Sequence, residues 1–143
     1  MKTIKQLLGE NPRKPLTIQP GDTVLAALET MAKHDIGALL VMEGDRLAGI
    51  FTERDYARKI ILHGKSSRDT LVSEIMTAKV CYAEPGQTVD QAMALMTEKR
   101  VRHLPVLEDG KTVVGMVSIG DLVKETISHQ AFVIKQLEHY IAS

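Results

Sequence analysis

Apolar and polar residues follow the same succession of patterns twice along this chain. Extended apolar segments at 16–20 and 80–85 each end at a proline, a residue that restricts the position before it to extended backbone. Apolar residues then recur every three or four positions, which predicts one helix in each half with a single core-facing side: Val24, Leu28 and Met31 in the first, and Val89, Met93 and Met96 in the second. Asp22 or Thr23 in the first half and Thr88 in the second are suited to cap these helices.

Two short apolar runs follow each predicted helix. The runs 38–42 and 47–51 flank Glu43-Gly44-Asp45, and the runs 104–108 and 113–117 flank a turn containing Asp109-Gly110. Such pairs predict β-hairpins. The segments 52–62 and 118–127 then open with a hydroxyl residue and place an acid in the first turn, which is typical of helix starts. Each half is therefore predicted to run strand, helix, strand, strand, helix.

The two halves also share residues in register. At an offset of 65, Pro20-Gly21 matches Pro85-Gly86 and Met31 matches Met96; beyond one inserted residue, at an offset of 66, the pairs are Gly49 with Gly115, Thr52 with Ser118, and Asp55 with Asp121. A constant spacing over about forty residues indicates an internal duplication. Because a half of some fifty residues has a marginal core by itself, we expect an α+β fold in which two pseudo-symmetric β-α-β-β-α repeats pack through their sheets.

The predicted organisation has five parts: an N-terminal segment at 1–15, repeat 1 at 16–63, a connector at 64–79, repeat 2 at 80–127, and a C-terminal helical extension at 128–143. The connector carries Val72, Ile75 and Met76, which need cover, so we expect a short helix on the surface of repeat 2. The C-terminal extension holds more apolar residues than one small repeat needs. This favours a homodimer, the alternative being that the extension covers its own sheet.

Composition excludes several classes of function. Lysine plus arginine and aspartate plus glutamate both total 18, so broad attraction to nucleic-acid phosphates is not expected. Aromatic residues are 3% of the chain, which disfavours base-stacking platforms. No secretory start or long apolar run is present, and Cys81 has no second cysteine to pair with, so a cytoplasmic protein that neither enters nor spans a membrane is expected. Cys81 itself is interpreted as a small buried apolar residue.

Four motifs in this order resemble the CBS (cystathionine-beta-synthase) domain family: G-I-F-T-E-R-D at 49–55, G-M-V-S-I-G-D at 115–121, S-E-I-M-T at 73–77 and R-H-L-P-V at 102–106. The resemblance covers residues 16–127. It implies a pair of CBS repeats forming one disc, called a Bateman module, and it implies a regulatory role. The chain is similar to small stand-alone CBS pairs that carry no attached enzyme or transporter.

The residues at the strand-to-helix corners suit an adenine nucleotide. A carboxylate can accept both hydroxyls of a ribose, and Asp55 and Asp121 are placed for this. Thr52 and Ser118 stand at helix starts, where hydroxyls and backbone amides can meet a phosphate. Glycines 49 and 115 would let backbone approach a ligand, and apolar residues could sandwich a purine: Ile18, Ala38, Ile50 and Met116. The resemblance implies the same roles. The alternative for both acids is simple helix capping.

Basic residues are distributed unequally between the two candidate sites. In repeat 2, the L-P-V strand containing Pro105 is preceded or entered by Arg100, Arg102 and His103. In repeat 1 the basic residue is Arg54, which is matched by Gly120 in repeat 2. A phosphate removed from water needs a countercharge. The family resemblance implies that basic residues before this strand contact phosphate, so Arg54, Arg100, Arg102, His103 and Pro105 complete the candidate set. A surface ion pair is the alternative for Arg102 and His103.

No catalytic or metal site is expected. Glu53 and Asp55 point in different directions on a helix, and no nucleophile accompanies them. The five histidines lack metal-ligand spacing. The sequence therefore favours a sensor of AMP or NAD, with ADP, ATP and S-adenosylmethionine as further ligands, that signals to an unknown protein target. Its alternative is a nucleotide-independent adaptor that regulates a redox or metabolic enzyme.

Overall fold

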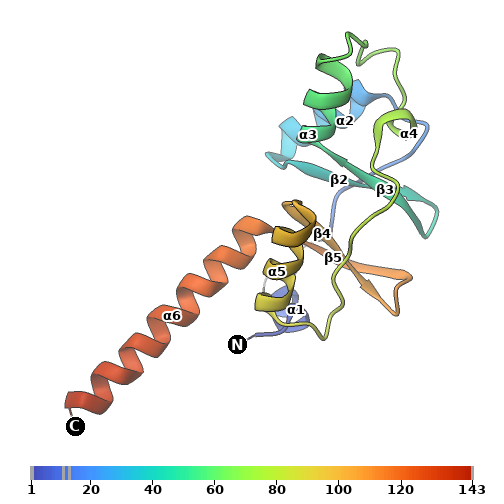
Figure 1. Cartoon of the computed structure of the whole chain (residues 1–143). Coiled ribbons are helices and arrows are strands. Elements are labelled where there is room, and N and C mark those ends of the chain that lie inside the picture. The colour runs from blue at the N-terminus through green and yellow to red at the C-terminus, as the bar shows by residue number, and fades with distance from the viewer. Residues whose placement is uncertain (1, 11, 13, 143) are drawn as a thin grey trace. The chain divides into compact units, whose positions relative to one another are not determined.

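The computed structural model describes residues 2–10, 12 and 14–142, and these fold as two compact units (Figure 1). The first-repeat unit comprises residues 14–81 and 109–113. The second-repeat unit comprises residues 1–13, 82–108 and 114–143. Each unit combines a small sheet with helices, which confirms the predicted α+β class with two repeats.

The first-repeat unit is built on a three-stranded sheet with β2 in the centre. β1 pairs parallel with β2, placing Ile18 beside Val41, and β3 pairs antiparallel with β2, placing Ile50 beside Leu40. Its elements are β1 (Thr17–Ile18), α2 (Val24–His34), β2 (Ala38–Glu43), β3 (Arg46–Thr52), α3 (Glu53–Asp55), a π-helical segment η1 (Tyr56–Ile61) and α4 (Val72–Ile75). Residues 38–41 are all buried, as expected for a central strand covered on both faces.

Local sequence explains the bounds of α2. The Thr23 hydroxyl accepts a hydrogen bond from the amide of Ala26 at 3.1 Å, which confirms a predicted cap. At the C-terminal end Asp35 adopts a left-handed conformation with φ of 51°, and its backbone amide donates a hydrogen bond to the carbonyl of Met31. Val24, Ala27 and Met31 face the core, as the three-and-four spacing predicts.

The connector does not lie on repeat 2. It forms the short helix α4 as predicted, but Val72 and Ile75 are buried in one cluster with Ile18, Val24 and Phe51 of the first-repeat unit. Backbone hydrogen bonds from Val72 to Asp22 and from Ser73 to Pro20 fix this position. The predicted location was therefore wrong, because apolar spacing identifies a face that needs cover without identifying the surface that covers it.

The second-repeat unit repeats this plan with a different partner. It contains α1 (Ile4–Glu10), α5 (Val89–Lys99), β4 (His103–Glu108), β5 (Thr112–Ser118) and α6 (Ile119–Ala142). Ala83 forms a parallel bridge with Val106, the only extended pairing that the described part of segment 80–85 makes. The amide of Ile4 donates to Gln87 and that of Lys5 to Pro85. The N-terminal segment thus serves repeat 2 in the way that the connector serves repeat 1.

α6 is much longer than its counterpart. The helix predicted at 118–127 continues to Ala142 and includes the C-terminal extension. Its first turns pack along α5, where the Thr126 hydroxyl contacts the Met93 sulfur at 3.3 Å. Within the described residues, no helix combines the length and the apolar character needed to cross a bilayer.

Candidate functional site

The first strand-to-helix corner, Thr52 to Asp55, is closed by its own unit. Asp55 Oδ2 accepts hydrogen bonds from the backbone amide and the hydroxyl of Thr52, at 3.0 and 3.1 Å. Asp55 Oδ1 accepts from the hydroxyl of Thr77 at 3.2 Å and lies 3.2 Å from Lys59 Nζ. With 7% of its surface exposed, Asp55 is already supplied with the donors that a ribose would offer.

The second corner, Ser118 to Asp121, has the same reciprocal cap. Asp121 Oδ2 accepts the amide of Ser118 at 2.9 Å, and the Ser118 hydroxyl accepts the amide of Asp121 at 3.2 Å. Both side chains are half-buried. Both corners therefore perform the capping that the sequence offered as the alternative role of the acids, a role that is compatible with ligand binding.

A cavity of about 280 Å³ lies beside Asp121. Three elements of the second-repeat unit enclose it: α1, β5 and the first turns of α6. Its lining consists of Leu7, Leu8, Glu10, Met116, Val117, Asp121, Lys124, Glu125 and Ser128. Two predicted ligand residues, Met116 and Asp121, are thus brought together on one cavity wall. Apolar side chains from two elements and a few polar groups are the usual composition of a small-molecule site.

Two differences distinguish the surroundings of the second corner from those of the first. Lys59, one turn after Asp55, pairs with that acid, whereas the equivalent residue one turn after Asp121 is Glu125. A second carboxylate cannot form this ion pair. In the first-repeat unit α4 ends at Ile75, and Thr77 then pairs with the backbone of Ile50.

The element that takes the place of α4 in the second-repeat unit is α1. It continues as a helix through Glu10, and residues 4–10 form no bridge with β5 of the kind that Thr77 forms with Ile50 of β3. Leu7, Leu8 and Glu10 instead form one side of the cavity.

Lys2 stabilises the acidic rim of the cavity. Its ammonium group contacts Glu10 at 2.7 Å and Glu125 at 3.2 Å, which ties α1 to α6. The hydrogen bond to Glu10, followed by the interactions with Glu125, raises the pKa of Lys2 above its ordinary value. Lys2 therefore keeps its positive charge throughout the physiological pH range.

Gly49 and Gly115, which were proposed to let a ligand approach the backbone, instead lie against neighbouring segments of the protein. A Cβ at Gly49 would stand 2.7 Å from the carbonyl oxygen of Thr77, and one at Gly115 would stand 2.8 Å from a methyl group of Leu8. These glycines therefore allow the connector and α1 to pack closely on β3 and β5. The interpretation of both as ligand approaches has no support in this packing.

None of the remaining candidate residues lines this cavity. Ile18, Ala38 and Ile50 are buried in the sheet of the first-repeat unit, where Arg54 is exposed on α3. In the second-repeat unit the Arg102 carbonyl accepts the amide of Ile119 at 2.8 Å, which holds the backbone of this arginine at the start of α6. Arg100 ends α5 in a left-handed conformation, His103 begins β4, and Pro105 is buried with its carbonyl bonded to Ala83.

Sequence reasoning did not identify the contribution of α1 to the site. Lys2, Leu7, Leu8 and Glu10 come from a segment that was assigned no role, and Lys124, Glu125 and Ser128 extend the site along α6. Helical spacing from Asp121 could have identified Lys124, Glu125 and Ser128, which lie three, four and seven positions further. Cys81, which was expected to be buried, is partly exposed.

Comparison with known proteins agrees with this architecture. The chain is 46% identical over 125 residues to the mitochondrial CBS domain-containing protein CBSX3 of Arabidopsis thaliana, a match covering 84% of this chain and 60% of that relative. The chain thus spans about three fifths of that relative's length. A CBS-domain protein of Burkholderia ambifaria MC40-6, solved as a candidate signal-transduction protein, is 54% identical with a TM-score of 0.85, covering 90% of this chain and 96% of its own.

A more distant solved structure carries bound ligands. The CBS domain pair of protein MJ0100, in complex with 5′-methylthioadenosine and S-adenosyl-L-methionine, is 25% identical with a TM-score of 0.79, covering 90% of this chain and 98% of its own. The family described as CBS domain matches this chain twice, at residues 5–62 and 72–128. These two matches contain both repeats, and each includes one strand-to-helix corner. The chain therefore belongs to the CBS-domain family and carries two tandem copies of the domain.

Proposed function

We propose that this protein is a non-catalytic sensor that binds one adenosine-containing ligand per chain in the cavity beside Asp121. The observation that carries the proposal is the difference between the two corners. Thr77 and Lys59 contact Asp55 at the first corner, whereas a cavity lies beside Asp121 at the second. A carboxylate at the cavity wall can accept the two hydroxyls of a ribose. Met116, Leu7 and Leu8 supply apolar surface for a purine.

The size and charge of the cavity favour AMP among the candidate ligands. A volume of about 280 Å³ is at the lower end for small-molecule sites and fits a mononucleotide better than NAD. Three carboxylates and one lysine line it, so each additional phosphate of ADP or ATP adds repulsion. Ser118, whose hydroxyl caps the start of α6, and Arg102, whose carbonyl accepts the amide of Ile119, are the proposed phosphate contacts.

Several features support a regulatory role. The Burkholderia relative is described as a candidate signal-transduction protein, and the MJ0100 domain pair binds adenosine derivatives. We extend both properties to this chain: ligand binding changes the population of two conformations, and a protein target distinguishes them, provided that the ligand binds one conformation more tightly. A homodimer and a cytoplasmic location complete the proposal, although the Arabidopsis relative is mitochondrial.

Calorimetric titration with AMP, ADP, ATP, NAD and S-adenosylmethionine tests the proposal. We expect saturable binding of AMP at one equivalent per chain, with ATP binding several-fold more weakly because of the carboxylates around the cavity. The same series at higher ionic strength should reduce the difference between AMP and ATP. If none of the five compounds binds, the sensor is excluded and the adaptor alternative is favoured.

A further inference from the structure

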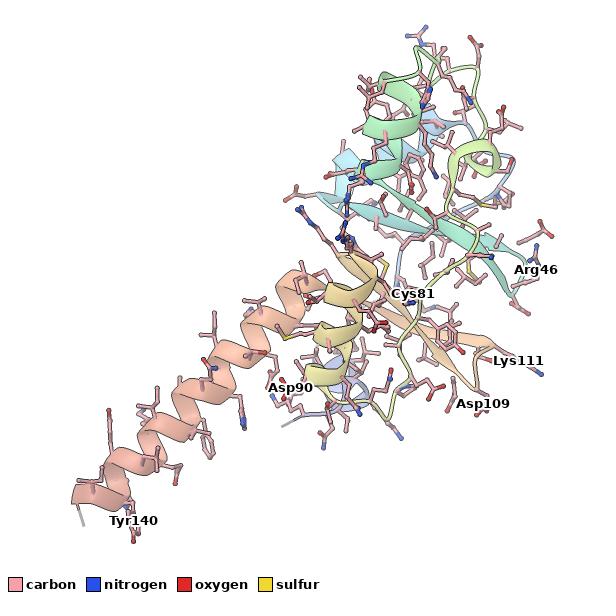
Figure 2. All side chains as sticks on the ribbon, viewed as in Figure 1. Arg46, Cys81, Asp90, Asp109, Lys111 and Tyr140 are labelled. Carbon is pink, nitrogen blue, oxygen red and sulfur yellow. The ribbon has the colours of Figure 1, made fainter. Side chains whose placement is uncertain are left out.

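The outer half of α6 presents a continuous apolar surface to solvent. Residues 131–141 are all exposed, and Figure 2 shows Tyr140 at the far end of α6, distant from α5 in the same unit. The large apolar side chains on this helix are exposed to the following extents: Val123 40%, Ile127 61%, Phe132 61%, Val133 40%, Ile134 56%, Leu137 56%, Tyr140 79% and Ile141 82%. Exposed apolar surface of this extent is typical of an interaction site.

Five of these eight apolar residues follow a heptad spacing together with Gln130. Alternating steps of four and three connect Val123, Ile127, Gln130, Ile134, Leu137 and Ile141, which we name the α6 seam. Isoleucines occupy its a positions and valine, glutamine and leucine its d positions. A seam of this type is the contact surface of two-stranded helical pairs. It spans about 28 Å at 1.5 Å per residue.

The seam is separate from the face by which α6 packs on its own unit. Leu122 is fully buried, and Glu125 and Thr126 are partly buried against α1 and α5. Val123 and Ile127 lie beside that face on the same helix and stay exposed. A second helix could therefore pack along the whole seam without displacing the contacts that hold α6 to its unit.

The seam is complementary to itself in the antiparallel direction. With two copies centred on Phe132, each a position faces a d position of the other copy: Ile127 faces Leu137, Ile134 faces Gln130, and Ile141 faces Val123. The flanking e positions then place Lys124 opposite Glu138 at both ends of the pair. In a parallel pair these two residues lie about four turns apart along the helices and cannot meet.

We infer that α6 pairs antiparallel with α6 of a second copy of this chain, through the α6 seam and two Lys124–Glu138 contacts. Such an arrangement is two-fold symmetric, so it forms a closed dimer without further addition of chains. The inference specifies the surface of the homodimer proposed above and does not depend on ligand binding. Adenosine compounds can therefore fail to bind while this dimer still forms, and the reverse also holds.

Sedimentation equilibrium of the full chain tests the surface. The wild type should be a dimer, and Ile134→Asp combined with Leu137→Asp should weaken dimerisation at least about a hundredfold, because unpaired charges would enter the seam. Lys135→Asp combined with Gln136→Asp is the matched control, since it adds two aspartates to the same turn outside the seam; it should remain dimeric. A monomeric wild type, or a seam variant as dimeric as the control, overturns the inference. The first of these results would assign the face to another protein or to lipid, the second to a dimer formed elsewhere.

Charge exchange tests the orientation. Glu138→Lys should weaken the dimer roughly three- to tenfold by opposing Lys124 of the second copy, and adding Lys124→Glu should restore wild-type affinity because both pairs are re-formed with reversed sign. In a parallel dimer the second substitution restores nothing, and that result contradicts the antiparallel arrangement. Circular dichroism of each variant checks that helix content is unchanged.

Discussion

Replacing Asp121 with alanine should weaken AMP binding about thirty- to a hundredfold while leaving the protein folded. The wild-type carboxylate accepts the Ser118 amide and lies in the cavity wall. Loss of two charge-assisted hydrogen bonds to a ribose corresponds to about 2–3 kcal/mol. Calorimetric titration of the variant with AMP measures the effect. Binding indistinguishable from that of the wild type would remove Asp121 from the site.

The first repeat supplies the matched control. Asp55→Ala removes the equivalent acid at the closed corner. The affinity of this variant for AMP should stay within about twofold of that of the wild type under conditions where the variant is folded, because distant sites act independently. Equal losses of affinity in the two variants would indicate that both corners hold ligand and would contradict the proposed stoichiometry of one.

Glu125→Lys tests the reason for the open corner while keeping Asp121. A lysine one turn after Asp121 reproduces the spacing of Asp55 and Lys59, whose charged groups lie 3.2 Å apart. The new ammonium group should occupy the carboxylate and lower AMP affinity. Glu125→Gln removes the same negative charge without supplying a cation, so it should retain binding. A lysine variant that binds AMP as well as the glutamine variant would argue against closure by this ion pair.

The second large effect concerns stability. Asp55→Ala should reduce the free energy of unfolding by about 2–3 kcal/mol, because it removes the helix cap, leaves the Thr77 hydroxyl without its acceptor and breaks the ion pair with Lys59. Asp121→Ala removes a cap at a half-buried corner, for which about 1 kcal/mol is expected. The acid that is less important for ligand binding is thus expected to be the more important one for folding.

Urea unfolding followed by circular dichroism compares the two alanine variants with the wild type. The comparison requires equal slopes of free energy against urea in all three proteins, since the slope reports the surface exposed on unfolding. A larger destabilisation by Asp121→Ala than by Asp55→Ala would show that Thr77 and Lys59 do not secure the first corner as the distances suggest.

Local patterns in the sequence were sufficient to predict most elements of both repeats. The spacing of Val24, Leu28 and Met31 predicted α2, and the threonine before it caps the start of the helix. The hairpins around Gly44 and Gly110 also formed, because both glycines adopt positive φ in the turns. These features depend on neighbours within a few positions, and for that reason sequence reasoning could identify them.

Long-range pairing accounts for what the sequence did not predict. The connector covers repeat 1 and the N-terminal segment covers repeat 2. This arrangement depends on long-range backbone hydrogen bonds, such as those of Val72 with Asp22 and of Ile4 with Gln87. The duplication suggested two equivalent corners. The difference between them arises from Thr77 and Lys59 on one side and from α1 with Glu125 on the other. Of these residues, only Thr77 lies in one of the family motifs, S-E-I-M-T at 73–77.

Mapping of AMP onto the ¹⁵N-labelled protein by amide chemical shifts tests the central claim most directly. Saturating AMP should shift the amides of Ser118, Asp121 and Glu125 strongly and leave those of Thr52, Asp55 and Thr77 almost unchanged. Shifts concentrated at the Thr52 to Asp55 corner, or equally large at both corners, would contradict a single open site beside Asp121.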